Sequence, residues 1–255
     1  MILHNNVFKK VSEVGMTNYI EINNARLCNC HRGYLSCIEP RNWMKNQIGV
    51  WQFTYEPRDV RDKKVHPAVF PISMAKRVIE QFTHKGELVL DPFVGSGTTL
   101  VAAQDLERNA VGFDLKQEYV DLSNARVANP PENHPCKQIA VCDDARNIVN
   151  RITPGTVKLV FTSPPYANIL NRERKNKSRR GDLRKNEQFG KIEQYSQDPR
   201  DLGTLSVENF EKVISEIFLA MKPVFMDKAH ILINITDAWI DGKRVPLHIN
   251  IINAM

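Results

Sequence analysis

Hydrophobic and polar positions change in blocks along most of the chain. Short apolar runs that end in polar or glycine-rich residues alternate with segments of helical length. Strands alternating with helices specify a doubly wound, mostly parallel sheet, so the predicted fold class is α/β. In such a sheet, ligands bind at the carboxyl ends of the strands. We expect strands at 88–90, 110–114, 138–142, 157–161 and 229–235, and helices at 72–82, about 98–106, 117–127 and 207–221.

The first of these strands ends in a turn that contains two glycines. Leu88–Leu90 runs into Asp91-Pro92, and Gly95 and Gly97 follow before a helix starts at Thr98 or Thr99. The glycines lack the Cβ atoms that would keep a flat or anionic ligand from the backbone, and the helix N-terminus presents free N–H groups. The turn alone is equally consistent with a tight strand–helix connection that holds no ligand.

Acidic residues end the next two strands. Asp114 lies 17 residues beyond Gly97, close to the position of the ribose-binding carboxylate in a βαβ nucleotide fold. The third strand ends at Asp143 and Asp144, and the fourth runs into the rigid sequence Thr162–Tyr166. These side chains are expected to meet at one edge of the sheet.

The first 50 residues are harder to interpret. Short strands are predicted at 7–8 and 19–22, and an alternating strand at 51–55, but residues 1–50 remain an unassigned segment before a domain at 51–255. Within the segment, the sequence places together Cys28, Cys30, His31 and Cys37. A zinc site is one interpretation. Because C-x-C-H-x5-C matches none of the usual paired spacings and thiols in half-buried strands are commoner, we predict no metal.

Composition sets outer limits on the protein class. The 255 residues include 42% hydrophobic residues, enough for a sizeable core, and 35 basic against 29 acidic residues, which favours a polyanionic partner. The sequence contains no signal peptide and no apolar run of membrane-spanning length. Five cysteines, an odd number, argue against a secreted disulfide framework. We therefore expect a soluble, cytoplasmic protein without a membrane partner.

Five short motifs together resemble one enzyme family. They are HPAVFP at 66–71, LDPFVGSGTT at 90–99, GFDL at 112–115, CDDA at 142–145 and TSPPY at 162–166. This set is similar to the amino-methylating DNA methyltransferases that use S-adenosylmethionine, in the cytosine-N4 and adenine-N6 branch. The resemblance covers about residues 50–255 and implies a Rossmann-like methyltransferase fold. A dehydrogenase is less consistent with the turn, because DPFVGSG departs from G-x-G-x-x-G.

The resemblance also implies roles for individual residues. Ser163 and the Pro164 carbonyl would bind the target amine, Pro165 would stiffen the turn, and Tyr166 would stack on a base flipped out of the duplex. Asp114 would bind the ribose of the cofactor, and Asp144 or its neighbour would reach the adenine amine; Asp143 is the weaker candidate, because a carboxylate after a strand is often a helix cap. The full set of expected cofactor-binding residues is His66, Ala68, Phe70, Asp91, Phe93, Gly95, Gly97, Asp114 and Asp144.

A basic segment follows the predicted catalytic motif. Residues 172–185 contain eight basic residues and two acids. A solvated loop is one interpretation, but the segment leaves the catalytic strand where a DNA backbone would pass, which favours phosphate contacts. The polar stretch 192–203 is expected to form an ordered lid or edge. The predicted DNA-binding residues are Arg172, Arg174, Lys175, Lys177, Arg179 and Arg180.

The predicted function is site-specific methylation of an exocyclic amine in double-stranded DNA. Cytosine-N4 is preferred over adenine-N6, because Ser163 stands where adenine enzymes commonly have Asp. The alternatives are an adenine-N6 enzyme, a non-catalytic DNA-binding remnant, and methylation of RNA or protein by the same fold.

The end of the sequence bears on whether the fold is complete. Residues 249–255 lie inside an expected helix after the fifth strand, whereas the family's sheet usually adds a final β-hairpin. We therefore expect a catalytic domain truncated at its C-terminus, with the fifth strand left as an exposed edge. A second chain could then complete the sheet or supply target recognition, and a companion restriction endonuclease is a further expected partner.

Overall fold

The computed structural model describes residues 18–31, 33–47, 49–59, 69–167, 198–240 and 243–255. The predicted strand at 7–8, His66, Ala68 and the six predicted DNA-binding residues lie outside these ranges. In the described part of the chain, no helix is long and apolar enough to cross a membrane.

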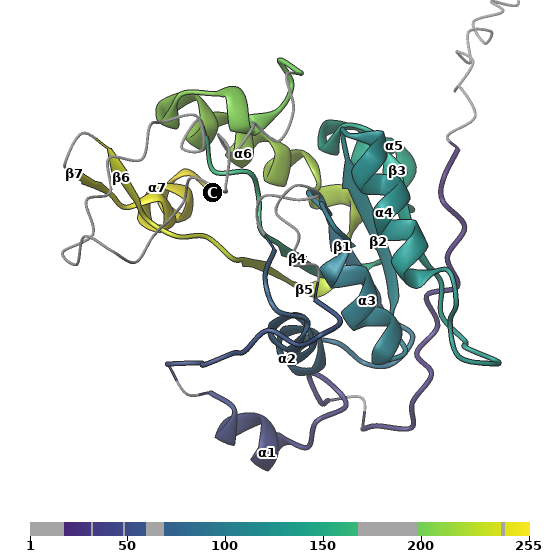
Figure 1. Cartoon of the computed structure of the whole chain (residues 1–255). Helices are drawn as coiled ribbons and strands as arrows, with labels where there is room; N and C mark the ends of the chain where they lie inside the picture. The colour runs from purple at the N-terminus through teal and green to yellow at the C-terminus, as the bar shows by residue number, and fades with distance from the viewer. Residues whose placement is uncertain (1–17, 32, 48, 60–68, 168–197, 241–242) are drawn as a thin grey trace, which may run out of the picture.

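Five parallel strands form one sheet in the order β3-β2-β1-β4-β5 (Figure 1). The strand order reverses direction from β1 to β4, which is the position where doubly wound sheets bind ligands. The predicted α/β class is confirmed. The strand bounds are β1 Leu88–Asp91, β2 Asn109–Asp114, β3 Gln138–Cys142, β4 Val157–Thr162 and β5 Phe225–Ile233.

Helices cover both faces of the sheet and enclose two apolar clusters. Alternate residues of β1 serve the two sides: Val89 belongs to the cluster beneath α2, α3 and α4, whereas Leu88 and Leu90 belong to the cluster beneath α6. The first face carries α2 Ile72–Phe82, α3 Thr98–Asp105 and α4 Gln117–Val127. The second carries η1 Ala145–Asn147, α5 Ile148–Arg151, η4 Leu202–Thr204, α6 Val207–Ala220, η5 Lys222–Val224 and α7 Leu247–Ala254.

Two predicted strands are wrong. Residues 19–22 and 51–55 are not strands, although their alternation suggested it. Ile20 and Ile22 pack against the core, and the Ile20 N–H donates to the Arg151 carbonyl at 2.8 Å. Alternating burial can therefore arise from an extended segment lying on a domain surface, without a strand partner. This segment also contains a short helix, α1 Pro40–Lys45, which the sequence did not predict.

A separate two-stranded antiparallel sheet follows β5. It consists of β6 Ala238–Ile240 and β7 Lys243–Val245, which pair with each other and not with the main sheet. Among the described strands, β5 therefore forms one edge of the five-stranded sheet.

Candidate active site

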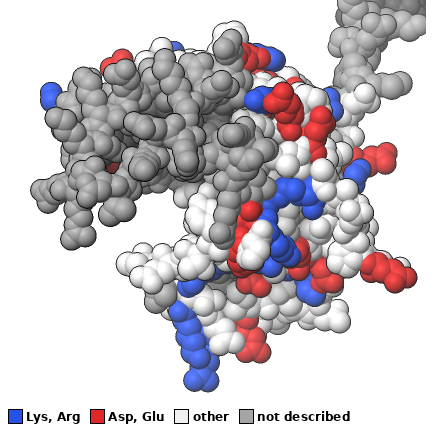
Figure 2. Space-filling model, in the orientation of Figure 1, with Lys and Arg blue, Asp and Glu red and all other residues white. Residues whose placement is uncertain are grey.

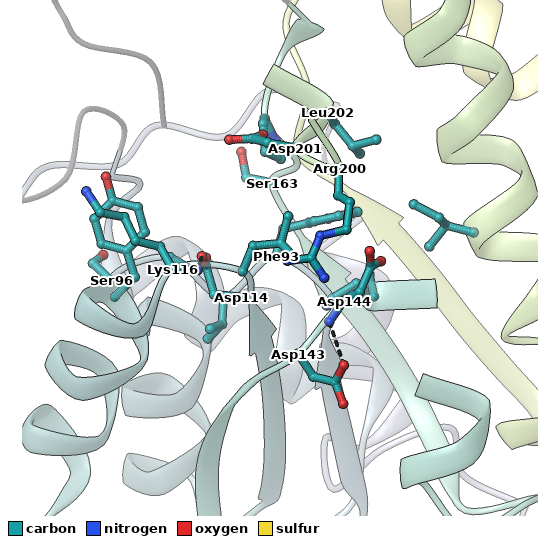
Figure 3. A pocket seen from close by; sticks show the side chains of 18 of the residues that line it. Phe93, Ser96, Asp114, Lys116, Asp143, Asp144, Ser163, Arg200, Asp201 and Leu202 are labelled. Carbon is teal, nitrogen blue, oxygen red and sulfur yellow. Dashed lines mark hydrogen bonds between the residues drawn. The ribbon is translucent and has the colours of Figure 1, made fainter. Parts of the chain in front are cut away.

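A pocket opens at the carboxyl ends of β1 to β4, where the sequence predicted a ligand site (Figure 3). The space between its walls is about 860 Å³, a figure that includes open solvent at the mouth. Predicted residues that line it are Phe70, Phe93, Gly95, Asp114, Asp143, Asp144, Ser163 and Pro165.

Asp91 stabilises the turn through hydrogen bonds to its carboxylate. It is 1% exposed, and its carboxylate accepts hydrogen bonds from the hydroxyls of Thr99 and Thr162, both at 2.6 Å, and from the Phe93 N–H at 3.1 Å. Burial raises the pKa of Asp91 to about 6 despite these three hydrogen bonds, which lower it. Asp91 thus links the end of β1 to α3 and to β4, and it is not among the residues that line the pocket.

The two glycines of the turn have different roles. Gly95, at φ +49°, lines the pocket, as does Ser96. Gly97, at φ +80°, does not line it, and a Cβ there would lie 2.8 Å from the Ser123 hydroxyl of α4. The sequence predicts that both glycines admit a ligand. At Gly97 the structure shows a second reason for glycine, which is the close packing of α4, whose Ser123 hydroxyl donates to the Gly95 carbonyl at 2.7 Å.

Asp114 lies at the end of β2 and faces the turn. Its two carboxylate oxygens accept from the Gly95 N–H at 3.0 Å and the Lys116 N–H at 2.9 Å. Burial raises the pKa of Asp114 to about 6, and the charges of Asp201 and Asp91 add to the increase, while the two hydrogen bonds oppose it. Each oxygen keeps a second lone pair with which it can accept from a ligand.

Asp143 and Asp144 follow β3, and their structural roles differ from the expected ones. Asp144 caps η1: its carboxylate accepts from the Arg146 N–H at 2.9 Å and pairs with the Arg146 guanidinium at 2.8 Å. Asp143 accepts from the Asp144 N–H and the Asn147 amide, both at 2.8 Å. Asp143 is the expected cap, but η1 begins directly after Asp144, which caps it. Both carboxylates line the pocket.

The opposite wall of the pocket comes from the end of β4. Ser163 Oγ lies 2.9 Å from the Tyr166 hydroxyl, which donates to the Asn234 carbonyl at 3.2 Å. Because a carbonyl only accepts, the single Tyr166 proton is used there, and Ser163 must donate to Tyr166. The Ser163 oxygen is therefore left as an acceptor. Pro164 is buried, and Pro165 lines the pocket beside Ser163.

Several pocket residues were missed by the sequence argument. Arg200, Asp201 and Leu202 come from the polar stretch expected to be a lid or edge, and no motif marks them. Figure 3 shows Arg200 extending toward the side of the pocket that contains Asp144. The contact between these distant segments depends on the folded chain, so local spacing could not reveal it. The other unpredicted lining residues include Lys116, Tyr119 and Arg146.

Charges on the described surface are mixed. Figure 2 shows basic side chains beside acidic ones on the face of the α2–α4 layer. Arg58 and Lys76, for example, both pair with Asp105. Because these basic side chains are paired with a carboxylate, they do not form an extended phosphate-binding patch.

Residues 10–125 match the model of a family described as DNA methylase. The chain is 42% identical over 96 residues to the type II methyltransferase M.BglI of Bacillus subtilis, covering 38% of this chain and 26% of the relative. It is 40% identical over 89 residues to M.SmaI of Serratia marcescens, covering 35% and 29%. The alignments span about a quarter to a third of these relatives' lengths.

Solved structures show weaker similarity. A putative methyltransferase from Streptococcus mutans, in complex with SAH, is 17% identical over 38% of this chain and 53% of its own, with a TM-score of 0.31. PH0851 is 11% identical over 64% of this chain and 32% of its own, with a TM-score of 0.42. With TM-scores this low, these two structures support no conclusion about this chain.

Proposed function

Because the sequence comparisons confirm the resemblance to amino-methylating DNA methyltransferases, we propose that the pocket binds S-adenosylmethionine and methylates an exocyclic amine of DNA. The observation that carries the proposal is the arrangement of Ser163 as a hydrogen-bond acceptor across the pocket from three carboxylates.

The carboxylate side of the pocket fits the donor. S-adenosylmethionine presents ribose hydroxyls, an adenine amine and a cationic ammonium, all of which donate hydrogen bonds, and it supplies an activated methyl group on a cationic sulfur. Asp114, Asp143 and Asp144 line the pocket as acceptors. Phe93 and Phe70 provide apolar surface, and the Phe70 ring is held edge-on against Phe161 with centroids 5.4 Å apart. Asp114 is assigned to the ribose and Asp144 to the adenine amine.

The β4 side fits the acceptor amine. The exocyclic amine of a base is a weak nucleophile, because its lone pair is delocalised into the ring. Ser163 Oγ would accept one amine N–H and the Pro164 carbonyl the other, so that the nitrogen is held in line with the methyl group. Tyr166 fixes the direction of the Ser163 hydroxyl through the 2.9 Å contact and would offer its ring face to the flipped base.

Within this proposal, cytosine-N4 is the preferred target and adenine-N6 the alternative, on the identity of Ser163. Double-stranded DNA is the proposed partner, bound through the basic residues 172–180, and the activity is placed in the cytoplasm. A second chain that completes the sheet or supplies target recognition, and a companion restriction endonuclease, stay predictions.

The experiment is a methyl-transfer assay on DNA of mixed sequence, followed by mass spectrometry of the nucleosides. The expected product is N4-methylcytosine. N6-methyladenine would overturn the base preference, and transfer to RNA or protein but not DNA would overturn the substrate. Calorimetric binding of the donor without any transfer would identify a non-catalytic remnant.

A variant tests the role of Ser163 in the same assay. Ser163→Ala should reduce the transfer rate by about 100-fold, as loss of a positioned polar group commonly does, while donor affinity measured by calorimetry stays unchanged. Tyr166→Phe serves as a control for orientation, since it keeps the Ser163 oxygen but removes the group that receives its proton, and should cost less. An unchanged rate in Ser163→Ala would remove this residue from its proposed role.

A further inference from the structure

The N-terminal segment is attached at the opposite end of β1 from the pocket. The Leu27 N–H donates to the Lys85 carbonyl at 2.8 Å, and the Asn109 amide donates to the Asn23 carbonyl at 2.9 Å. Gly86 has φ +85°, and a Cβ there would lie 2.1 Å from the Ala25 carbonyl oxygen. A side chain at this position would push the segment away, so the close approach requires glycine.

Three cysteines of this segment meet one histidine of the connection between α2 and β1. The ligand atoms of Cys28, Cys30, Cys37 and His84 all lie within 4.8 Å of one another. His84 Nδ1 lies 3.4 Å from Cys28 Sγ and 3.6 Å from Cys37 Sγ. In a tetrahedral zinc site with Zn–S near 2.3 Å and Zn–N near 2.0 Å, the sulfur–nitrogen separation is about 3.5 Å. Both measured separations match this value.

The histidine is oriented as a metal ligand would be. His84 is fully buried, and its Nε2 lies 3.0 Å from the Tyr34 carbonyl oxygen. Since the carbonyl only accepts, Nε2 carries the proton and Nδ1 presents its lone pair to the sulfurs. A backbone carbonyl that fixes the tautomer in this way is the usual outer partner of a zinc-bound histidine.

Donors around the cluster favour thiolate sulfur. The Lys85 N–H donates to Cys37 Sγ at 3.4 Å. Arg26, two residues before Cys28, lines a hollow together with Cys28 and Cys30, and its guanidinium pairs with Glu87 at 3.3 Å. Three thiolates and a neutral imidazole around a divalent cation carry a net charge of −1, and the hydrogen bond from the Lys85 N–H stabilises one of these thiolates.

We propose that Cys28, Cys30, Cys37 and His84 bind one zinc ion in a structural site. Four protein ligands fill the tetrahedron and leave no position for water or substrate, so the site stabilises the fold and takes no part in methyl transfer. The ion would fasten the segment of the three cysteines to the amino end of β1. This inference does not depend on the proposed function.

The proposal revises the sequence interpretation at one residue. His31 was the expected histidine, but its Nδ1 accepts from the Gly33 N–H at 3.1 Å, and it is not part of the cluster. The fourth ligand is His84, which lies 47 residues beyond Cys37. The prediction of no metal was based on the spacing C-x-C-H-x5-C. That spacing covers only residues 28–37 and therefore does not include His84.

The first test is the metal content of the full chain, purified without added metal and measured by mass spectrometry. We expect one equivalent of zinc, which Cys28→Ser and Cys37→Ser lose. Cys142→Ser removes an exposed thiol outside the cluster, and His31→Ala removes the rejected histidine, so both controls should keep the zinc. Absence of zinc from the unaltered chain, or its loss in the His31 control alone, would overturn the ligand set.

Cobalt substitution of the unaltered chain tests the ligands without relying on how a variant folds. The unaltered chain with Co²⁺ should give the intense visible bands of a tetrahedral site and a thiolate charge-transfer band. Cys30→Ser should lose these bands, just as Cys28→Ser and Cys37→Ser lose zinc, because each variant removes one of the three thiolates. A weak octahedral spectrum, or iron with acid-labile sulfide in the purified chain, would contradict the proposal.

Discussion

The two ends of β1 are built on opposite plans. At the carboxyl end of this four-residue strand, the turn 91–99 is continuous in sequence, and its polar groups are oxygens and backbone N–H groups. At the amino end, His84 meets three cysteines that lie 47 to 56 residues earlier in the chain. The first end is arranged to bind and release a small molecule, whereas the second is arranged to hold one ion permanently.

The two sites differ in how far apart in the sequence their residues lie. The turn needs only residues that follow one another, because the strand, the bend and the helix start are consecutive. The sulfur cluster needs a separate segment to be brought to the strand, and Gly86 allows this approach. Damage to the turn is therefore expected to affect the centre of the sheet, and damage to the cluster to affect the attachment of the segment.

Asp91→Ala should have the largest effect on stability. The substitution leaves the buried Thr99 and Thr162 hydroxyls and the Phe93 N–H without their acceptor. We expect the free energy of unfolding to fall by about 3 to 5 kcal/mol, as when a buried hydrogen-bond network is broken. Urea unfolding followed by circular dichroism measures it.

Asp91→Asn is the matched control. It keeps one oxygen acceptor and nearly the same volume, so the loss should be smaller, about 1 to 2 kcal/mol. Equal losses in the two variants would show that the volume and the single oxygen that Asn keeps contribute nothing, so that both carboxylate oxygens are needed at the end of β1.

The same contrast explains what the sequence could and could not predict. The helix bounds 72–82 and 117–127 and the strand 138–142 agree with the structure. For the helix 72–82 the reason is a strong local pattern, because its apolar residues fall on one face. Asp114 and Ser163 line the pocket as predicted, because strand ends of a parallel sheet converge on one edge.

Other parts depend on contacts that local patterns do not encode. His84 lies in a short connection with no motif around it, and its relation to Cys28 exists only in the folded chain. The pocket residues Arg200 and Asp201 come from a polar stretch separated from the other motifs. The packing of Gly97 against Ser123 could not be predicted either, because Ser123 lies on another helix.

Gly97→Ala should have the next largest effect. A Cβ at 2.8 to 2.9 Å from Ser123 and a φ of +80° should together cost about 2 to 4 kcal/mol of unfolding free energy. Gly155→Ala is the matched control, because Gly155 has φ +70° with nothing within 4 Å of an added Cβ. It should cost only about 1 kcal/mol, from the backbone alone. Equal costs would mean that α4 does not press on the turn.

The change in donor affinity with pH should be the smallest of these effects. It tests the carboxyl end of β1 alone, because Asp114 lies at that end. Asp114 accepts ligand hydroxyls when ionised, and burial raises its pKa from 3.8 to about 6. Affinity for S-adenosylmethionine should therefore be level above pH 7 and fall by about tenfold by pH 5, where the carboxyl is mostly protonated. Calorimetry at both pH values measures this, and Asp114→Asn should bind more weakly at pH 7 but lose that dependence.

The same titration after zinc removal should give the same affinity within about twofold, because sites more than 7 to 10 Å apart rarely couple and β1 separates these two by about 13 Å. A larger change would mean that the segment fastened at the amino end of β1 helps to set the geometry of the turn at its carboxyl end. The zinc site and the donor pocket would then be energetically coupled through the four residues of β1.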